Sequence, residues 1–144
     1  MSLEENKMIA RRHFEQIWNE GQLDLISTYF APGFLNFGNP CPLERVRQIV
    51  LIWRTAFPDL QFTIEEQIAE ADQVLTRCIC SGTHLGPFEH PMVGSLASTG
   101  KRFTVQQMHL TRLRDGQIVE HWAVRDDLSM VQQLGVVFLP ISEL

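Results

Sequence analysis

A strand and a helix meet in residues 118–135, which read IVEHWAVRD and then DLSMVQQLG. In a strand, alternate side chains point to the same face of the sheet. The pattern therefore predicts one mostly apolar face directed at the core, formed by Ile118, Glu120, Trp122, Val124 and Asp126. The opposite face then carries His121, Ala123 and Arg125.

Asp126 ends the apolar row, and two roles fit it. A carboxylate buried among apolar side chains has a raised pKa, which suits proton transfer near neutral pH. Alternatively, the side chain caps the N-terminus of the helix that follows, as an Asp in front of an apolar periodic run often does. The pattern alone leaves both roles open.

The composition is that of an ordinary globular protein, with 44% hydrophobic and 20% charged residues in a chain of 144. We expect a single domain over residues 1–144, because that length supports one substantial core. The net charge of -5 and the scattered basic residues argue against a nucleic-acid partner. No apolar stretch is long enough to span a bilayer, and Met1–Lys7 does not resemble a signal peptide, which predicts a cytoplasmic protein without a membrane partner.

The cysteines and histidines show no metal or redox motif. The three cysteines are Cys41, Cys78 and Cys80, and an odd number argues against a disulfide framework. We expect Cys78 and Cys80 to be buried as small apolar side chains. The five histidines form neither an H-x-H nor an H-E-x-x-H motif, so no metal and no cofactor are predicted.

The first half of the chain is predicted to be mainly helical. Apolar residues at helical spacing predict helices over Leu3–Trp18, Leu23–Phe30 and Leu43–Ala56. Pro42 stands where a helix tolerates proline, immediately at its start. Between the second and third helices, Phe34–Pro40 alternates apolar and polar residues and predicts a short extended segment.

The second half is predicted to be a sheet. Strands are expected around Leu60–Ile64, over Val74–Leu85, over Arg102–Leu113 and over Ile118–Asp126, with residues 85–100 as a long loop. Asp115-Gly116 predicts a hairpin between the last two strands. Helices followed by an antiparallel meander indicate the α+β class. A curved antiparallel sheet around the N-terminal helices, with a short C-terminal helix, would enclose a concave apolar pocket for a small ligand.

Several motifs in order along the chain resemble a known family. They are AFPDL at 56–60, THLG at 83–86, TGK at 99–101, Arg112, DGQIVEHW at 115–122, Asp126 and QQLG at 132–135. The set resembles the cone-shaped fold of the nuclear transport factor two superfamily, and within it the SnoaL-like polyketide cyclases.

The resemblance implies ring closure by intramolecular aldol condensation without a metal or organic cofactor. A carboxylate and one or more histidines then move protons, and an apolar pocket folds the substrate. It also implies a homodimer through the sheet. One departure matters, because aromatic polyketide cyclases carry the general acid/base Asp directly after the Trp of the E-x-W segment, and this chain has Ala123 there.

Three residues are the catalytic candidates: Asp126 as general acid/base, with His84 and His109 orienting or polarising the substrate. For His84 the alternative is a histidine whose hydrogen bonds are satisfied by backbone at a strand end. For His109 it is a buried polar group paired within the core. The best candidates for aromatic pocket walls are Trp53, Trp122, Phe34, Phe37 and Phe88. The alternative for each is ordinary core packing, which is the commoner role of aromatic residues at such spacing.

Three functions are open at this point. The first is a cofactor-independent cyclase-like enzyme acting on an apolar, carbonyl-containing small molecule, and the second is a non-catalytic small-ligand binding module of the same fold. The third is an isomerase or epoxide hydrolase of the same superfamily. The isomerase would use a Tyr in its oxyanion hole, and Tyr29 is the only tyrosine. The hydrolase would use an Asp-Arg-Asp cluster, which Arg125 and Asp126 on opposite strand faces do not form.

Overall fold

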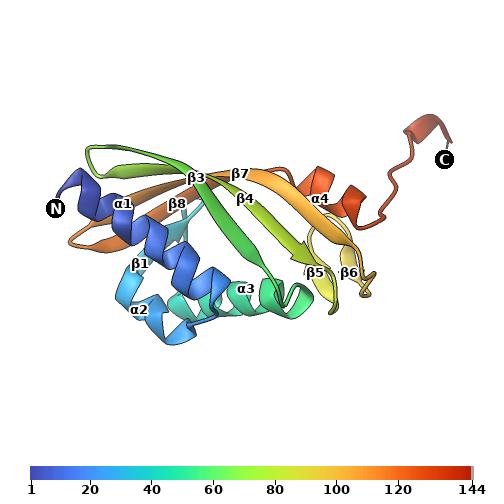
Figure 1. The fold of residues 1–144 in the computed structure, drawn as a ribbon, viewed down its shortest axis with the longest axis horizontal. Helices are drawn as coiled ribbons and strands as arrows, with labels where there is room; N and C mark the ends of the chain where they lie inside the picture. Colours follow the sequence, from blue (N-terminus) through green and yellow to red (C-terminus); the bar gives the residue numbers. More distant parts are fainter. Residues whose placement is uncertain (144) are drawn as a thin grey trace.

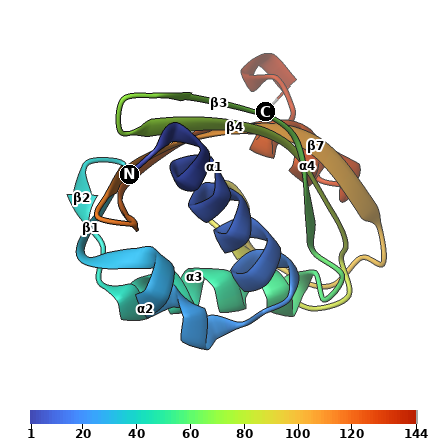
Figure 2. The ribbon, with the colours of Figure 1, turned by 60° about the vertical axis from the view of Figure 1, so that its left-hand side comes forward.

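The computed structural model describes residues 1–143, in which an arched sheet covers three N-terminal helices (Figure 2). The helices are α1 (Leu3–Arg12), α2 (Ile26–Tyr29), α3 (Leu43–Ala56) and α4 (Asp127–Gln133). The strands are β1 (Phe30–Asn36), β2 (Asn39–Pro40), β3 (Gln61–Glu70), β4 (Gln73–Thr83), β5 (Phe88–His90), β6 (Gly94–Leu96), β7 (Arg102–Arg114) and β8 (Gln117–Arg125). This arrangement confirms the predicted α+β cone.

The main sheet has the strand order β2-β1-β8-β7-β4-β3. Strands β3, β4, β7 and β8 form the predicted antiparallel meander. The sheet is nevertheless mixed, because β1 pairs with β8 in parallel. The predicted loop over residues 85–100 contains a separate hairpin of β5 and β6, which lies at the end of the cone near α4 (Figure 1).

Helix α1 begins at a capped N-terminus and ends in an unusual turn. The Ser2 hydroxyl accepts a hydrogen bond from the Glu5 N–H (3.1 Å), which satisfies one of the free donors of the first turn. The predicted helix then continues as a π-helical segment, His13–Asn19. Gly21 follows with a φ of 73°, a left-handed conformation that glycine adopts without strain.

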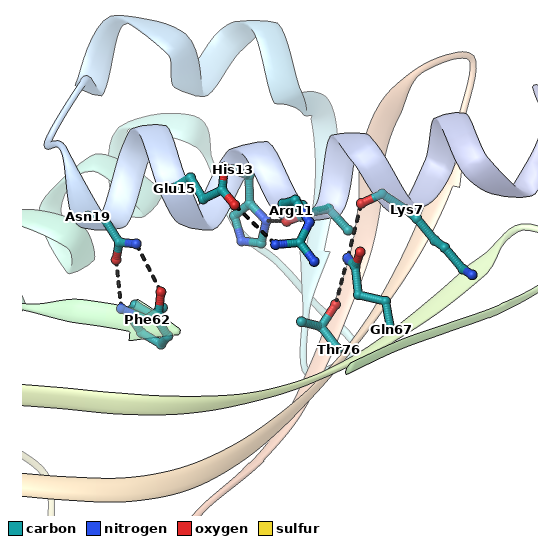
Figure 3. A network of polar contacts seen from close by, with 9 residues as sticks. Lys7, Arg11, His13, Glu15, Asn19, Phe62, Gln67 and Thr76 are labelled. Carbon is teal, nitrogen blue, oxygen red and sulfur yellow. Dashed lines mark hydrogen bonds and ion pairs between the residues drawn. The ribbon is translucent and has the colours of Figure 1, made fainter. Parts of the chain in front are cut away.

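Side-chain amides attach α1 and its π-helical extension to the sheet (Figure 3). The Asn19 side chain donates to the Phe62 carbonyl (3.0 Å) and accepts from the Phe62 N–H (2.7 Å), as a neighbouring strand would. At the other end, the Gln67 amide donates to the Lys7 carbonyl (3.0 Å) and to the Thr76 hydroxyl (3.3 Å). The helix is therefore held across the open side of β3, where it covers the interior of the cone.

Two apolar clusters fill the two ends of the fold. One surrounds Phe57 and Phe103 near α4, and the other surrounds Phe30 and Ile118 near α2. The three cysteines are buried free thiols, and burial confirms the prediction for Cys78 and Cys80. No helix within residues 1–143 is long and apolar enough to cross a membrane.

A bulge in β8 overturns the predicted assignment of its faces. Arg112 pairs with Glu120, but the next residue of β7, Leu113, pairs with Ile118, so Val119 is an extra residue in β8. An extra residue exchanges the two faces for everything beyond it. Ile118 is buried as predicted, whereas Trp122 is 44% and Val124 is 78% exposed. The prediction that Glu120, Trp122, Val124 and Asp126 face the core was therefore wrong.

Candidate functional site

A cavity lies between the arched sheet and the helices, with about 700 Å³ of space counted out to its open mouth. Its walls are mostly aromatic and aliphatic, with a few polar groups on β1, β7 and β8. The lining residues are His13, Phe14, Trp18, Phe30, Phe34, Asn36, Phe37, Val46, Ile49, Trp53, Phe62, Gln107, His109, Thr111, His121 and Arg125.

Four polar side chains form a continuous hydrogen-bonded row in the cavity wall. The Asn36 Oδ1 lies 2.8 Å from Nδ1 of His121. The Nε2 of His121 lies 2.8 Å from Nδ1 of His109, and the Nε2 of His109 lies 2.8 Å from Oε1 of Gln107. The two imidazole rings lie nearly parallel, with centroids 5.1 Å apart.

The strands place these side chains together. Gln107, His109 and Thr111 alternate along β7 and so share its inward face, where all three are buried. The Val119 bulge turns His121 inward on the neighbouring β8. The parallel pairing of β1 with β8 sets Asn36 beside His121, and this contact completes the row.

The three hydrogen bonds of the row need one more N–H proton than two neutral histidines carry. With both amide oxygens turned toward the rings, each of the three hydrogen bonds needs an N–H from an imidazole. Two neutral imidazoles supply two N–H groups, and one protonated ring beside a neutral one supplies three. With both rings neutral, all three contacts would be satisfied only if one amide presented its NH₂ group to the adjacent ring nitrogen.

Burial keeps both rings neutral. Desolvation lowers the pKa of His121 to about 3, and the nearby His13 and Arg125 lower it further. Desolvation also holds the pKa of His109 well below its ordinary value, and the nearby His121, His13 and Arg125 lower it further. At neutral pH the pair is therefore an unprotonated base in an apolar wall.

His13 contributes a third imidazole, from the π-helical segment that closes the cavity. Its Nδ1 lies 2.7 Å from the Ala10 carbonyl oxygen, which fixes the proton on that nitrogen. Figure 3 shows the His13 ring on the side of the helix that faces the strands. Burial lowers its pKa to about 4, so this ring is also neutral at neutral pH.

Arg125 lies at the end of β8, next to Gln107 in the sheet. Its guanidinium carbon lies 5.8 Å from the ring centre of Trp53, and its Nη2 lies 3.5 Å from the Asp127 carboxylate. The side chain is 33% exposed, which places it toward the mouth of the cavity.

The three predicted catalytic residues lie in different places. His109 lines the cavity, as described. Asp126 is exposed and caps α4, since its Oδ1 accepts from the Ser129 N–H (3.1 Å), and it is not among the lining residues. His84 is buried against Phe57, outside the lining, and its Nδ1 lies 3.0 Å from the Thr99 hydroxyl. The cavity therefore brings only His109 of the three to a ligand.

The predicted aromatic walls divide in the same way. Trp53, Phe34 and Phe37 line the cavity. Phe88 is wholly buried in the cluster around Phe57, where their ring centres are 5.0 Å apart. Trp122 points outward because of the bulge, and its Nε1 donates to Glu120 (2.7 Å) on the outer face.

Sequence reasoning placed His121 on the wrong face and did not single out Asn36, Gln107 or His13. Gln107 had a usable signal, because it stands two residues before His109 on the same face of an uninterrupted strand. Asn36 and His13 had none, since a long-range parallel pairing and a π turn position them. Within residues 1–143 no group of three or more His, Cys, Asp or Glu side chains is arranged to hold a metal ion.

Comparison with known proteins agrees with this architecture. A family model described as SnoaL-like polyketide cyclase matches residues 8–134. Aklanonic acid methyl ester cyclase AcmA of Streptomyces galilaeus is 30% identical over 139 residues, which is 90% of this chain and 90% of that protein. Nogalonic acid methyl ester cyclase of Streptomyces nogalater is 30% identical over 127 residues, which is 82% of this chain and 89% of that protein. The structure of TsrD from Streptomyces laurentii superposes with a TM-score of 0.83 at 25% sequence identity. The match covers 95% of this chain and 99% of the TsrD chain.

Proposed function

The chain belongs to the family of SnoaL-like polyketide cyclases, and from that premise we propose that it closes a ring in a carbonyl-rich, largely apolar small molecule by intramolecular aldol addition. The two methyl ester cyclases that it is similar to carry out ring closures by name, which supports this reaction class. The aromatic cavity supplies the surface that folds such a chain so that its reacting carbons meet.

The reaction needs a group that takes one proton and returns it. The base removes a proton from a carbon between two carbonyl groups, and the resulting carbanion attacks a second carbonyl carbon of the same molecule. A carbon–carbon bond forms, the attacked oxygen becomes an alkoxide, and that alkoxide takes the proton back. The product is an isomer of the substrate, so no oxidant or reductant is consumed.

We assign this role, accepting and returning the proton, to the His109–His121 pair. The hydrogen-bonded row that contains both rings is the main observation that supports the assignment. The neutral pair accepts a proton, after which the row is complete with both amide oxygens turned inward. Asn36 and Gln107 thus stabilise the protonated pair at both ends, without water entering the cavity. In this proposal Asp126 acts as a helix cap and His84 as a core residue.

The test compares two conservative variants in the same turnover assay. The first substrates to try are the methyl esters of aklanonic and nogalonic acid, because the similar proteins are named for them. Liquid chromatography with mass spectrometry would detect a product of unchanged mass and changed retention. We expect His109→Gln to lower turnover about a hundredfold or more, the usual scale for loss of a general base, and Asp126→Asn to leave it within about twofold. The reverse result would return the base to Asp126.

Binding without turnover would support the alternative of a non-catalytic binding module. That outcome requires the unmodified protein to bind apolar carbonyl compounds and to release them unchanged, with the same affinity in His109→Gln. The isomerase alternative has less support, because Tyr29 is outside the cavity lining and donates its hydroxyl to Gln16.

We also propose that two copies pair through the outer face of the sheet. Trp122, Val124 and Met108 expose apolar surface there, on two adjacent strands. Light scattering should give the mass of a dimer, and Val124→Lys should shift it toward the 16.6 kDa of one chain. A single-chain mass for the unmodified protein at micromolar concentration would refute the pairing.

A further inference from the structure

Arg125 is the one permanently charged side chain among the described residues that line the cavity. The other titratable groups in the lining are His13, His109 and His121, and burial lowers the pKa of each. At neutral pH the cavity therefore presents a single positive charge within an apolar wall. A bound anion gains more from such a charge than it would in water, because the local dielectric is low.

Trp53 in the cavity wall and Asp127 outside it orient the guanidinium. It lies over the face of Trp53, and Asp127 approaches one end of it at 3.5 Å. Asp127 does not line the cavity, and its Oδ2 is shared with Nε2 of His90 at 3.1 Å. These two contacts orient the guanidinium of a side chain that lines the cavity.

The donors of Arg125 are not used by the rest of the protein. Among residues 1–143 no group lies in hydrogen-bonding geometry to its guanidinium, since the approach of Asp127 is an ion pair of unfavourable hydrogen-bond geometry. A guanidinium carries five N–H donors in a planar fork that matches the two oxygens of a carboxylate. The guanidinium fork can therefore bind the carboxylate of a ligand.

Arg125 is set apart from the proton-transfer pair along the same strand. The inward positions of β8 are occupied by His121, Ala123 and Arg125 in turn. Four residues of strand separate the first from the last, which is roughly 13 Å between their backbones. Ala123 lies between them, opposite His109 in the sheet.

Resting on the proposed function, we propose that Arg125 binds the carboxylate of the substrate, so that the cavity selects free acids over their methyl esters. The carboxylate lies at the mouth, and the carbon that loses its proton lies deeper, beside His109. This assigns the chain a substrate class different from the methyl esters for which its relatives are named. Arg125 determines specificity and takes no part in the proton transfer.

A matched pair of ligands tests this directly, without requiring turnover. The probes are 2-naphthoate and methyl 2-naphthoate, which differ only in the charge and the methyl group. Isothermal titration at pH 7.5 should give about tenfold tighter binding of the acid to the unmodified protein, the scale of one hydrogen bond to a charged group. The affinity for the acid should fall as salt is added, and the affinity for the ester should not.

Three variants locate the effect. Arg125→Gln should abolish the preference for the acid, and Arg125→Lys should keep part of it, because Lys retains the charge and loses the planar fork. Arg114→Gln removes the same charge from an exposed position at the far end of the sheet and should change nothing. Because the acid-to-ester ratio is measured within each variant, a modest loss of stability does not imitate the result.

The outcomes separate this proposal from the proposed function. Equal binding of acid and ester, binding of neither probe, or a preference that persists in Arg125→Gln would each overturn the role of Arg125. His109→Gln should lower turnover and keep the preference for the acid. A fully active His109→Gln variant would refute the proton-transfer assignment and leave the binding result standing.

Discussion

Replacing His13 by Gln should remove part of the acid sensitivity of the fold. The side chain is 3% exposed, and burial lowers its pKa from 6.5 to about 4. Since the pKa in the folded state is below that in the unfolded state, the unfolded chain takes up the proton first as the pH falls. The contribution of His13 to the free energy of unfolding is therefore fully present above about pH 6.5 and is lost as the pH falls toward 4.

The size of the effect follows from that window. At pH 5 the pH is about 1.5 units below the unfolded-state pKa of 6.5, so the unfolded histidine is protonated, while the folded ring is still mostly neutral. This difference corresponds to about 2 kcal/mol of unfolding free energy. His121, whose pKa is lowered to about 3, contributes in the same direction. Gln has the size to keep a hydrogen bond to the Ala10 carbonyl, and it does not titrate.

Urea unfolding at pH 7 and pH 5 measures the difference. The unmodified protein should lose about 2 kcal/mol more than His13→Gln between the two pH values. Between pH 7 and 8.5 the two proteins should change in parallel, because neither state then binds protons at this histidine. An equal loss in both proteins between pH 7 and 5 would refute the neutral, buried state of His13 from which the argument starts.

Three further results are expected from the contacts described. Asp126→Ala should lower the stability by about 1 kcal/mol through loss of the α4 cap, and Asp126→Asn by less, as measured by thermal unfolding. Gly86→Ala should cost about 3 kcal/mol or prevent folding, because its Cβ would lie 2.2 Å from the Thr55 carbonyl oxygen, whereas Gly33→Ala meets no atom within 4 Å and should be mild. Cys78, whose pKa burial raises to about 12, should not react with a thiol reagent such as dithionitrobenzoate until the protein unfolds; rapid reaction in the native state would contradict this packing.

Local signals predicted most of the architecture. Helix α3 has the predicted bounds, Leu43–Ala56, because Pro42 precedes its first residue, Pro58 follows shortly after its last, and the apolar spacing between them is regular. The α1 helix was predicted in extent, but its change to a π-helical turn at His13 carries no sequence signature. The predicted helix Leu23–Phe30 ends one residue early, because Phe30 joins the sheet and pairs with Ile118. That contact lies far away in the sequence, and local propensity does not report it.

The site was predictable only where a strand alternates without interruption. His109 was found because β7 alternates buried and exposed residues along most of its length. Asp126 was favoured because β8 was read with the same uninterrupted alternation, which the Val119 bulge breaks. The alternative role as a helix cap was already visible from the apolar run after it, and the structure places the side chain in that position.

The outer face of the sheet determines which residues the cavity receives. On that face Arg112 donates to Glu120 (3.1 Å) and to Asp72 (2.8 Å), and Trp122 donates to Glu120. These contacts require Glu120 and Trp122 to point outward, on the side of Arg112, and this is possible only if Val119 bulges. Without the bulge, Trp122 would fill the cavity, and His121 and Arg125 would point to the outer face. The proton-transfer pair and the anion site inside the cone therefore depend on one register, which an ion network on the opposite face of the sheet stabilises.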